Sequence, residues 1–311
     1  MRTDVAPDRP VQGGGTGPGA PAGGGHEHRK GPWPFVTLRR YRHGGRPFVW
    51  RAREHRKGTK PAARGLDAAA LPFWQRPFYN WLTGLLFAVG AFLFLAGSTM
   101  TLAPETFGGA STMAINVVFF LGSIPFTTAG YLQHFQAANA PAFHPDPAVA
   151  STAAAAATRR RGRVALIGWH PHSPGWISTF TQFVGTVAFN FNTGDALLAP
   201  EGWLVRELAI WGPDLVGSGL FLVSGYLAYI EAGHAYWSIR PRDLDWWIVT
   251  INLLGCAAFM ASAVLAFIPS GPEPLWITAA STATLWLGAL CFLVGALLLM
   301  RESRLAMRWG R

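Results

Sequence analysis

Six long apolar runs, separated by polar connections, dominate the chain from residue 77 to residue 300. Each run is close to the ~20 residues that an α-helix needs to cross about 30 Å of hydrocarbon. Charged residues are rare inside the runs. The pattern therefore predicts six transmembrane helices, at Trp81–Leu102, Ala114–Phe135, Trp176–Leu198, Leu215–Trp237, Trp246–Phe267 and Ile277–Met300.

The positive charges fall almost entirely on one side of these predicted spans. Of the 26 Lys and Arg residues, 15 precede the first span, four lie between the second and third, two between the fourth and fifth, and four after the sixth. The other three connections hold only Arg206. Because Lys and Arg concentrate in cytoplasmic loops, we expect a multi-pass protein of the cell (inner) membrane with both termini in the cytoplasm.

A repeated spacing of small and aromatic residues joins the six runs into three pairs. In each pair, a Trp precedes a Gly by nine residues, a Phe follows that Gly by four, and the next run carries a second Gly with a Phe four residues later. Residues at i and i+4 share one helix face, where small residues let helices in lipid approach closely. The repeat predicts three parallel helical hairpins, anchored at Trp81, Gly90, Phe94, Gly122 and Phe126, at Trp176, Gly185, Phe189, Gly217 and Phe221, and at Trp246, Gly255, Phe259, Gly288 and Phe292.

Together these features predict an all-α, polytopic membrane protein with six transmembrane helices as three helical-hairpin repeats and a small basic cytoplasmic N-terminal segment. Residues 1–28 are rich in Gly and Pro, so we expect them to be disordered. In residues 29–76, two β-prone runs around Gly44 and Gly45, the second extending through Lys57, favour a β-hairpin. The rest divides into hairpins at 77–136, 176–237 and 246–300, a cytoplasmic loop at 137–175 and a basic cytoplasmic tail at 301–311.

The repeated phrase resembles the YrhK-like domain, a two-helix membrane unit of bacterial proteins. In that phrase a helix with Gly and Phe is followed by a Gly-Ser helix that ends in Gly-Tyr-Leu, as at 122–132 and 217–227. The stretches at 175–193 and 244–263 are also similar to actinobacterial integral membrane proteins. The similarity covers residues 81–300. This family has no established activity, so the resemblance implies an architecture and no catalytic residue.

Four amide side chains inside the predicted spans are the first candidates for a site. Gln182 and Asn252 each precede a repeat glycine by three residues, and Asn190 and Asn192 lie deeper in the third span. Hydrogen bonds between helices are a sufficient role for such amides. The alternative is a small polar site on the pseudo-threefold axis at mid-membrane, as in transporters built from repeats. The spans show neither the broken helices nor the buried charges that transporters generally carry.

A second candidate is a metal site near the cytoplasmic end of the fourth span. Glu231 and His234 stand three residues apart, and His170 and His172 lie on the same predicted side of the membrane. Imidazole and carboxylate ligands suit Zn, Fe or Mn. The alternative is an interfacial pair in which Glu231 stays ionised beside water, Arg240 or Arg242, contributing about 0 to 1 kcal/mol.

The net charge of +10 lies beside apolar spans, so we expect anionic lipid head groups at the cytoplasmic face as partners rather than nucleic acid. Cys256 and Cys291 both fall inside spans, where we expect free thiols. The sequence favours a non-enzymatic membrane or envelope-associated protein without a cofactor. The alternatives are a small-molecule or ion transporter that uses the polar axial site, and a metal-dependent membrane enzyme.

Overall fold

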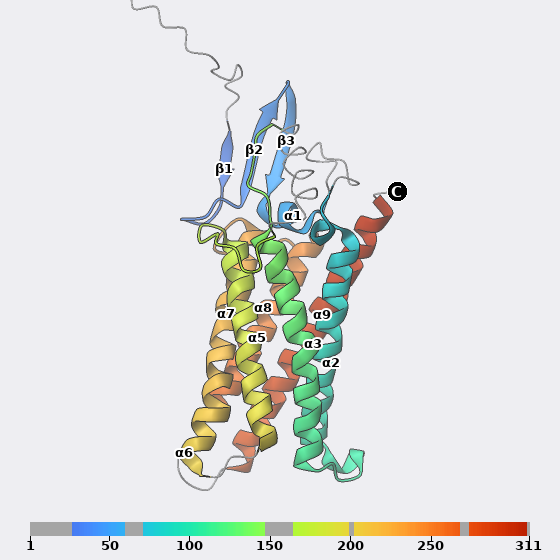
Figure 1. Cartoon of the computed structure of the whole chain (residues 1–311), viewed down its shortest axis with the longest axis vertical. Coiled ribbons are helices and arrows are strands. Elements are labelled where there is room, and N and C mark those ends of the chain that lie inside the picture. Colours follow the sequence, from blue (N-terminus) through green and yellow to red (C-terminus); the bar gives the residue numbers. More distant parts are fainter. Residues whose placement is uncertain (1–26, 60–70, 147–163, 199–201, 268–273, 310–311) are drawn as a thin grey trace, which may run out of the picture.

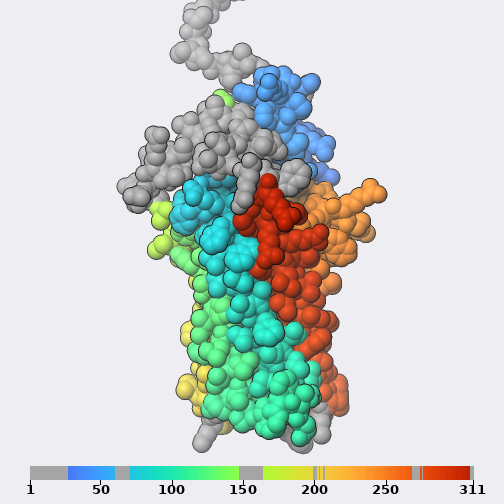
Figure 2. All heavy atoms as spheres, turned by 90° about the vertical axis from the view of Figure 1, so that its right-hand side faces the viewer, coloured from blue at the N-terminus to red at the C-terminus, as the bar shows by residue number. Residues whose placement is uncertain are grey.

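Six long helices stand side by side and form a closed ring (Figure 1). The computed structural model describes residues 27–59, 71–146, 164–198, 202–267 and 274–309. Each helix packs against the next along the chain, and the last packs against the first, as the face in Figure 2 also shows. The helices are α2 (Pro77–Leu102), α3 (Thr112–Ala138), α5 (Pro174–Leu198), α7 (Gly212–Gly233), α8 (Leu244–Leu265) and α9 (Leu275–Trp309).

The helices have the length and surface of a polytopic membrane protein. Within the described residues, five helical segments are long and apolar enough to cross a membrane, and many large apolar side chains face outward from the bundle. The helix α5 has 25 residues but is not one of the five, because its Thr, Gln and Asn side chains make it less apolar. The all-α membrane architecture is therefore supported, while the count of six spans stays a prediction.

Short irregular elements mark the end of the bundle that lies away from the N-terminal strands, here called the far end (Figure 1). A 3-10 turn, η4 (Pro104–Phe107), joins α2 to α3. A short helix, α6 (Trp203–Arg206), and one π-helical turn, η5 (Glu207–Trp211), lead into α7. Single π-helical turns next to or inside α-helices are frequent at functional sites. This turn precedes Leu215, where the predicted fourth span begins, so it does not interrupt that span.

At the opposite end, here called the sheet end, three antiparallel strands stand on the bundle (Figure 1). The strands β2 (Leu38–His43) and β3 (Arg46–Arg51) form a hairpin around Gly44 and Gly45, which both have positive φ. A further strand, β1 (His28–Lys30), pairs with β2 and was not predicted. The second β-prone run does not continue to Lys57, because Ala52–Lys57 form the helix α1, closed by Gly58 at φ 68°. The expected disorder of 1–28 lies almost wholly outside the described residues.

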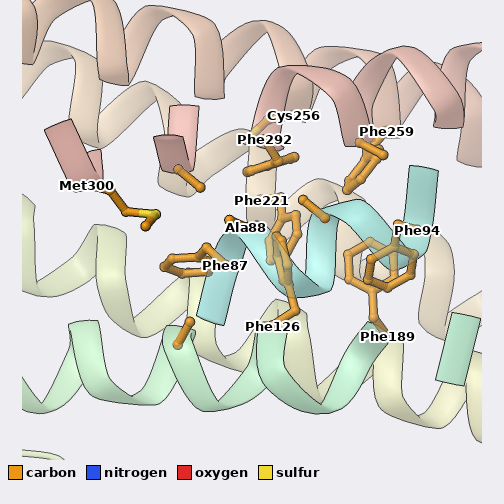
Figure 3. Close-up of a cluster of buried hydrophobic side chains, with 14 residues drawn as sticks. Phe87, Ala88, Phe94, Phe126, Phe189, Phe221, Cys256, Phe259, Phe292 and Met300 are labelled. Carbon is orange, nitrogen blue, oxygen red and sulfur yellow. The ribbon is translucent and has the colours of Figure 1, made fainter. Parts of the chain in front are cut away.

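Six phenylalanines meet in the middle of the bundle (Figure 3). Those of α3, α7 and α9 contact one another, with ring centroids 5.5 to 6.0 Å apart. Each also contacts a phenylalanine of the preceding long helix, at 5.9, 5.0 and 5.1 Å. Such contacts between rings stabilise the bundle in addition to the burial of each ring's large apolar area. The six, here called the phenylalanine layer, are Phe94, Phe126, Phe189, Phe221, Phe259 and Phe292.

Paired glycines set the distance between the two helices of each hairpin. A methyl group added to Gly90 would lie 2.8 Å from the carbonyl oxygen of Gly122. A methyl group added to Gly185 would lie 3.1 Å from the carbonyl oxygen of Gly217, and one added to Gly255 would lie 3.2 Å from the carbonyl oxygen of Gly288. Backbones this close leave no room for a side chain, which explains the glycines at these positions.

Candidate functional site

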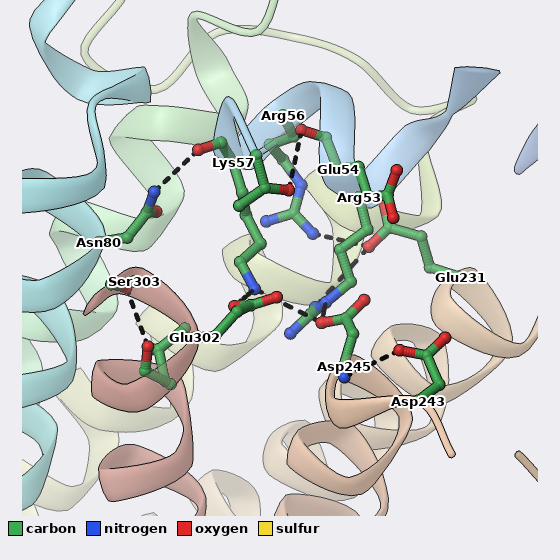
Figure 4. A network of polar contacts seen from close by, with 12 residues as sticks. Arg53, Glu54, Arg56, Lys57, Asn80, Glu231, Asp243, Asp245, Glu302 and Ser303 are labelled. Carbon is green, nitrogen blue, oxygen red and sulfur yellow. Dashed lines mark hydrogen bonds and ion pairs between the residues drawn. The ribbon is translucent and has the colours of Figure 1, made fainter. Parts of the chain in front are cut away.

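The helix α1 closes the sheet end of the bundle with three buried cationic side chains (Figure 4). Arg53, Arg56 and Lys57 stand at i, i+3 and i+4, so they share one face of this short helix. Each points toward carboxylates at the ends of the long helices. We call α1 with these three side chains the plug.

Three carboxylates from three different long helices balance the three charges of the plug. Glu231 comes from the end of α7, Asp245 from the first turn of α8 and Glu302 from α9. Glu231 is only 1% exposed. The contacts run from Arg56 Nη2 to Glu231 Oε2 (2.6 Å), from Arg53 Nε to Asp245 Oδ1 (2.7 Å), from Lys57 Nζ to Asp245 Oδ1 (3.4 Å) and from Lys57 Nζ to Glu302 Oε2.

Burial makes these pairs strongly dependent on one another. Burial acts to lower the pKa of Arg53, but the negative charges of Asp245 and Glu231 outweigh it and raise that pKa above its usual value. A buried charge without its partner is costly, so the loss of one member destabilises the remaining members. The expectation that the spans hold no buried charge was wrong at this end of the bundle.

Polar side chains of the neighbouring helices hold the backbone of α1 in place. Gln75 Nε2 donates to the carbonyl of His55 (2.9 Å), and Asn80 Nδ2 donates to the carbonyl of Lys57 (2.8 Å). Gln136 Nε2 in turn donates to Asn80 Oδ1 (2.9 Å). The carbonyl groups at the C-terminal end of α1, which a free helix would leave without partners, therefore accept hydrogen bonds from Asn80 in the first turn of α2 and from Gln75 just before α2. Positive φ at Gly58 permits this close approach.

Beneath the plug lies a small cavity of about 50 Å³, here called the sheet-end cavity. Arg53 lines it from above, and Gln182 and Asn252 line it together with Cys256. Two of the four predicted axial amides are therefore brought to one cavity. Phe221 of the phenylalanine layer also borders it.

A larger cavity of about 310 Å³, here called the far-end cavity, lies on the other side of the phenylalanine layer. Phe221 borders this cavity too. Two carboxylates line it, Glu207 of η5 and Asp214 of α7, together with Trp211 and Asn192. Glu207 is 8% exposed, and among the described residues its Oε2 has no hydrogen-bond partner. A buried carboxylate oxygen of this kind is a candidate contact for a cationic ligand.

The four predicted amides therefore do not form one axial site. Asn190 Nδ2 donates to Thr127 Oγ1 (2.9 Å), which is a helix-to-helix contact. Asn192 Nδ2 donates to the carbonyl of Ile210 (2.8 Å) and helps to hold the π-helical turn. The phenylalanine layer lies between the cavity of Gln182 and Asn252 and the cavity of Asn192.

The four candidate metal ligands are not brought together either. Among the described residues, no group of three or more His, Cys, Asp or Glu side chains is placed to hold a metal ion. His170 contacts the carbonyl of Ala138 (3.1 Å), and His172 is exposed. His234 does not continue the helix of Glu231, because α7 ends at Gly233 and His234 adopts φ 55°, with Nδ1 3.0 Å from Thr37 Oγ1.

The predicted partner of Glu231 was wrong. The carboxylate contacts Arg56, which precedes it by 175 residues, and not Arg240 or Arg242. Sequence reasoning missed the plug because the run containing Arg53, Arg56 and Lys57 was assigned to a strand. Their i, i+3, i+4 spacing was the available signal.

Comparison of the chain with protein-family models, with curated proteins and with solved structures gives no match. The resemblance to the YrhK-like domain therefore stays a prediction. We therefore infer the function from the geometry of the plug and the two cavities.

Proposed function

We propose that this chain is a non-enzymatic transporter of small organic cations in the cell membrane, with the plug as its cytoplasmic gate. The observation that carries the proposal is the presence of two cavities within the helix ring, one on each side of the phenylalanine layer. One is large enough for a small solute. The other lies beneath α1, whose buried ion pairs to the long helices can be broken in a conformational change. This arrangement corresponds to a closed state.

The proposed topology has six spans, with α5 as the third, and three hairpin repeats of YrhK-like type. The equivalent glycine contacts and phenylalanine pairs of the three hairpins support the repeat. The distribution of Lys and Arg supports cytoplasmic termini and a cytoplasmic sheet end. The far end would then face outward.

The charge at the far end supports a cationic solute. The three connections on this side, together with the last turn of the third span, carry six acidic residues and one basic residue along the sequence, a balance of −5. Such a field raises the local concentration of cations. Inside the far-end cavity, carboxylates next to aromatic rings are the groups that bind organic ammonium ions. The acidic residues are Glu105, Asp195, Glu201, Glu207, Asp214 and Glu273.

A purely structural role in membrane or envelope association is the competing proposal. The plug would serve it equally well, as an anchor for the N-terminal strands. That role gives no reason for a buried carboxylate oxygen, Glu207 Oε2, that has no hydrogen-bond partner among the described residues and lies beside a solute-sized cavity. We therefore place transport first.

Uptake by proteoliposomes tests the function. We expect purified chain to take up labelled ethylammonium or tetramethylammonium above the level of empty liposomes. Glu207→Gln together with Asp214→Asn should lower the uptake at least tenfold. Glu105→Gln, at the same end but outside the cavity lining, is the matched control. A second variant, Arg53→Gln with Lys57→Gln, weakens the plug. Transport of these cations would be contradicted if neither the parent chain nor this variant took up more than empty liposomes do.

A further inference from the structure

Two arginines in the connection between α7 and α8 have no acidic partner among the residues that the structure describes. Arg240 and Arg242 flank Pro241 and, with Arg51, border an open pocket of about 600 Å³. Across the described part of the chain, no ion pair joins either Arg240 or Arg242 to a carboxylate. Asp243 also borders the pocket, but its Oδ1 accepts the backbone N–H of Asp245 (3.1 Å) and caps α8. Arg51 pairs with Glu54 (2.8 Å), so Arg240 and Arg242 leave the pocket with one positive charge more than its remaining acidic residue, Asp243, supplies.

Aromatic side chains hold the backbone of this connection. Trp246 Nε1 donates to the carbonyl of Ser238 (2.8 Å), and the hydroxyl of Tyr229 donates to the same oxygen. Trp247 Nε1 donates to the carbonyl of Pro241 (2.9 Å). The two arginines therefore extend from a backbone that is fixed before any ligand binds, which lowers the entropy cost of binding.

The same connection exposes large apolar side chains next to the arginines. Trp237 is 76% exposed and Ile239 is 85% exposed. Tryptophan is enriched where transmembrane helices meet the head-group region, and this connection lies where α7 ends and α8 begins. Apolar side chains next to cationic ones suit a ligand with an apolar part and an anionic part.

We propose that Arg240 and Arg242, assisted by Arg51, bind the phosphate of an anionic phospholipid head group, while Trp237 and Ile239 contact its apolar part. The planar guanidinium group can donate two parallel hydrogen bonds to phosphate oxygens. Basic pockets at the cytoplasmic ends of transmembrane helices are suited to anionic head groups. This site is independent of the far-end cavity and of transport.

Native mass spectrometry of the full chain in neutral detergent tests the site. We expect phosphatidylglycerol to be retained in preference to phosphatidylcholine. Arg240→Gln with Arg242→Gln should weaken that binding about 30-fold, which is about 2 kcal/mol at 1.4 kcal/mol per tenfold. The matched control is Arg42→Gln with Arg46→Gln, which removes the same charge from the hairpin near Gly44, away from the bundle.

Three results would overturn the proposal. The first is equal retention of both lipids by the parent chain. The second is an equal loss of phosphatidylglycerol in the control variant, which would indicate nonspecific attraction to the net charge. The third is displacement of the lipid by millimolar inorganic phosphate, which would identify a site for soluble phosphate.

Discussion

Glu231 lies beneath the plug, where its carboxylate is buried and bonded to Arg56. The sequence suggested an interfacial pair worth about 0 to 1 kcal/mol, so that Glu231→Gln would be tolerated. The geometry changes this prediction. Removing the charge leaves Arg56 buried without a counter-charge, and such losses cost about 3 to 5 kcal/mol.

We therefore expect Glu231→Gln to lower the free energy of unfolding by about 3 kcal/mol, measured by denaturant titration in mild detergent. Adding Arg56→Gln should restore part of the loss, because the unpaired cation is then removed. Glu27→Gln is the control, since its pairs with Arg29 and Arg39 are partly exposed and should contribute less than about 1 kcal/mol. A loss at Glu231 no larger than at Glu27 would contradict the buried network.

His234 is a second residue whose burial has a measurable consequence. Burial, together with the positive charges of Arg240, Arg51 and Lys30, lowers its pKa from 6.5 to about 4. Between these values the unfolded chain binds a proton that the folded chain does not. The stabilisation that neutral His234 contributes to the free energy of unfolding is therefore fully present above pH 6.5. It is lost as the pH falls toward 4, by about 3 kcal/mol in all.

His234→Asn should make the unfolding free energy less dependent on pH between 4 and 6.5. Asparagine tolerates the positive φ at this position, so the variant keeps the helix end while removing the titrating group. The measurement is the difference between the pH profiles of parent and variant. Parallel profiles would show that His234 takes up its proton equally in both states.

At the scale of elements, the long helices were predictable and the plug was not. Apolar runs of about 20 residues identify transmembrane helices locally. The helix α1 has six residues, too few for a helix that is stable alone, and it exists through contacts with residues 175 to 245 positions away. No local pattern specifies those partners. The far-end cavity was missed for the same reason, because the elements that line it are distant in sequence.

The glycine contacts within hairpins give a prediction at this scale. A methyl group at Gly217 would lie 3.1 Å from the backbone oxygen of Gly185, whereas one at Gly219 in the same helix would meet nothing within 4 Å. We expect Gly217→Ala to destabilise the bundle by about 1 to 3 kcal/mol. Gly219→Ala should be neutral or stabilising by up to about 1 kcal/mol, since alanine favours a helix. Equal effects in denaturant titrations would contradict the close crossing of α5 and α7.

At the scale of the whole molecule, the number of spans depends on α5. Its 25 residues correspond to about 37 Å of helix, enough to cross about 30 Å of hydrocarbon despite its polar side chains. Reporter fusions after Arg163 and after Glu201 should therefore report opposite sides of the membrane. Fusions after Arg242 and Arg311 should report the cytoplasm. The same side for Arg163 and Glu201 would leave five spans and place the termini on opposite sides.

At this scale too, the plug closes the sheet end of the bundle, and the reactivity of the Cys256 thiol reports on that closure. Cys256 is 3% exposed and lines the sheet-end cavity beneath Arg53. With Cys291 replaced by Ala, it becomes the single thiol of the chain. Gly217→Ala serves as the control, because it destabilises the bundle and leaves the plug intact.

The decisive measurement is the rate at which a small, charged, membrane-impermeant thiol reagent added from the cytoplasmic side modifies Cys256. We predict slow modification in the Cys291→Ala chain and in its Gly217→Ala derivative. Arg53→Gln with Lys57→Gln leaves Asp245 and Glu302 without partners and should raise the rate at least tenfold. An unchanged rate in that folded variant, or an equal rise in the Gly217→Ala control, would contradict the claim that the plug closes this end of the bundle.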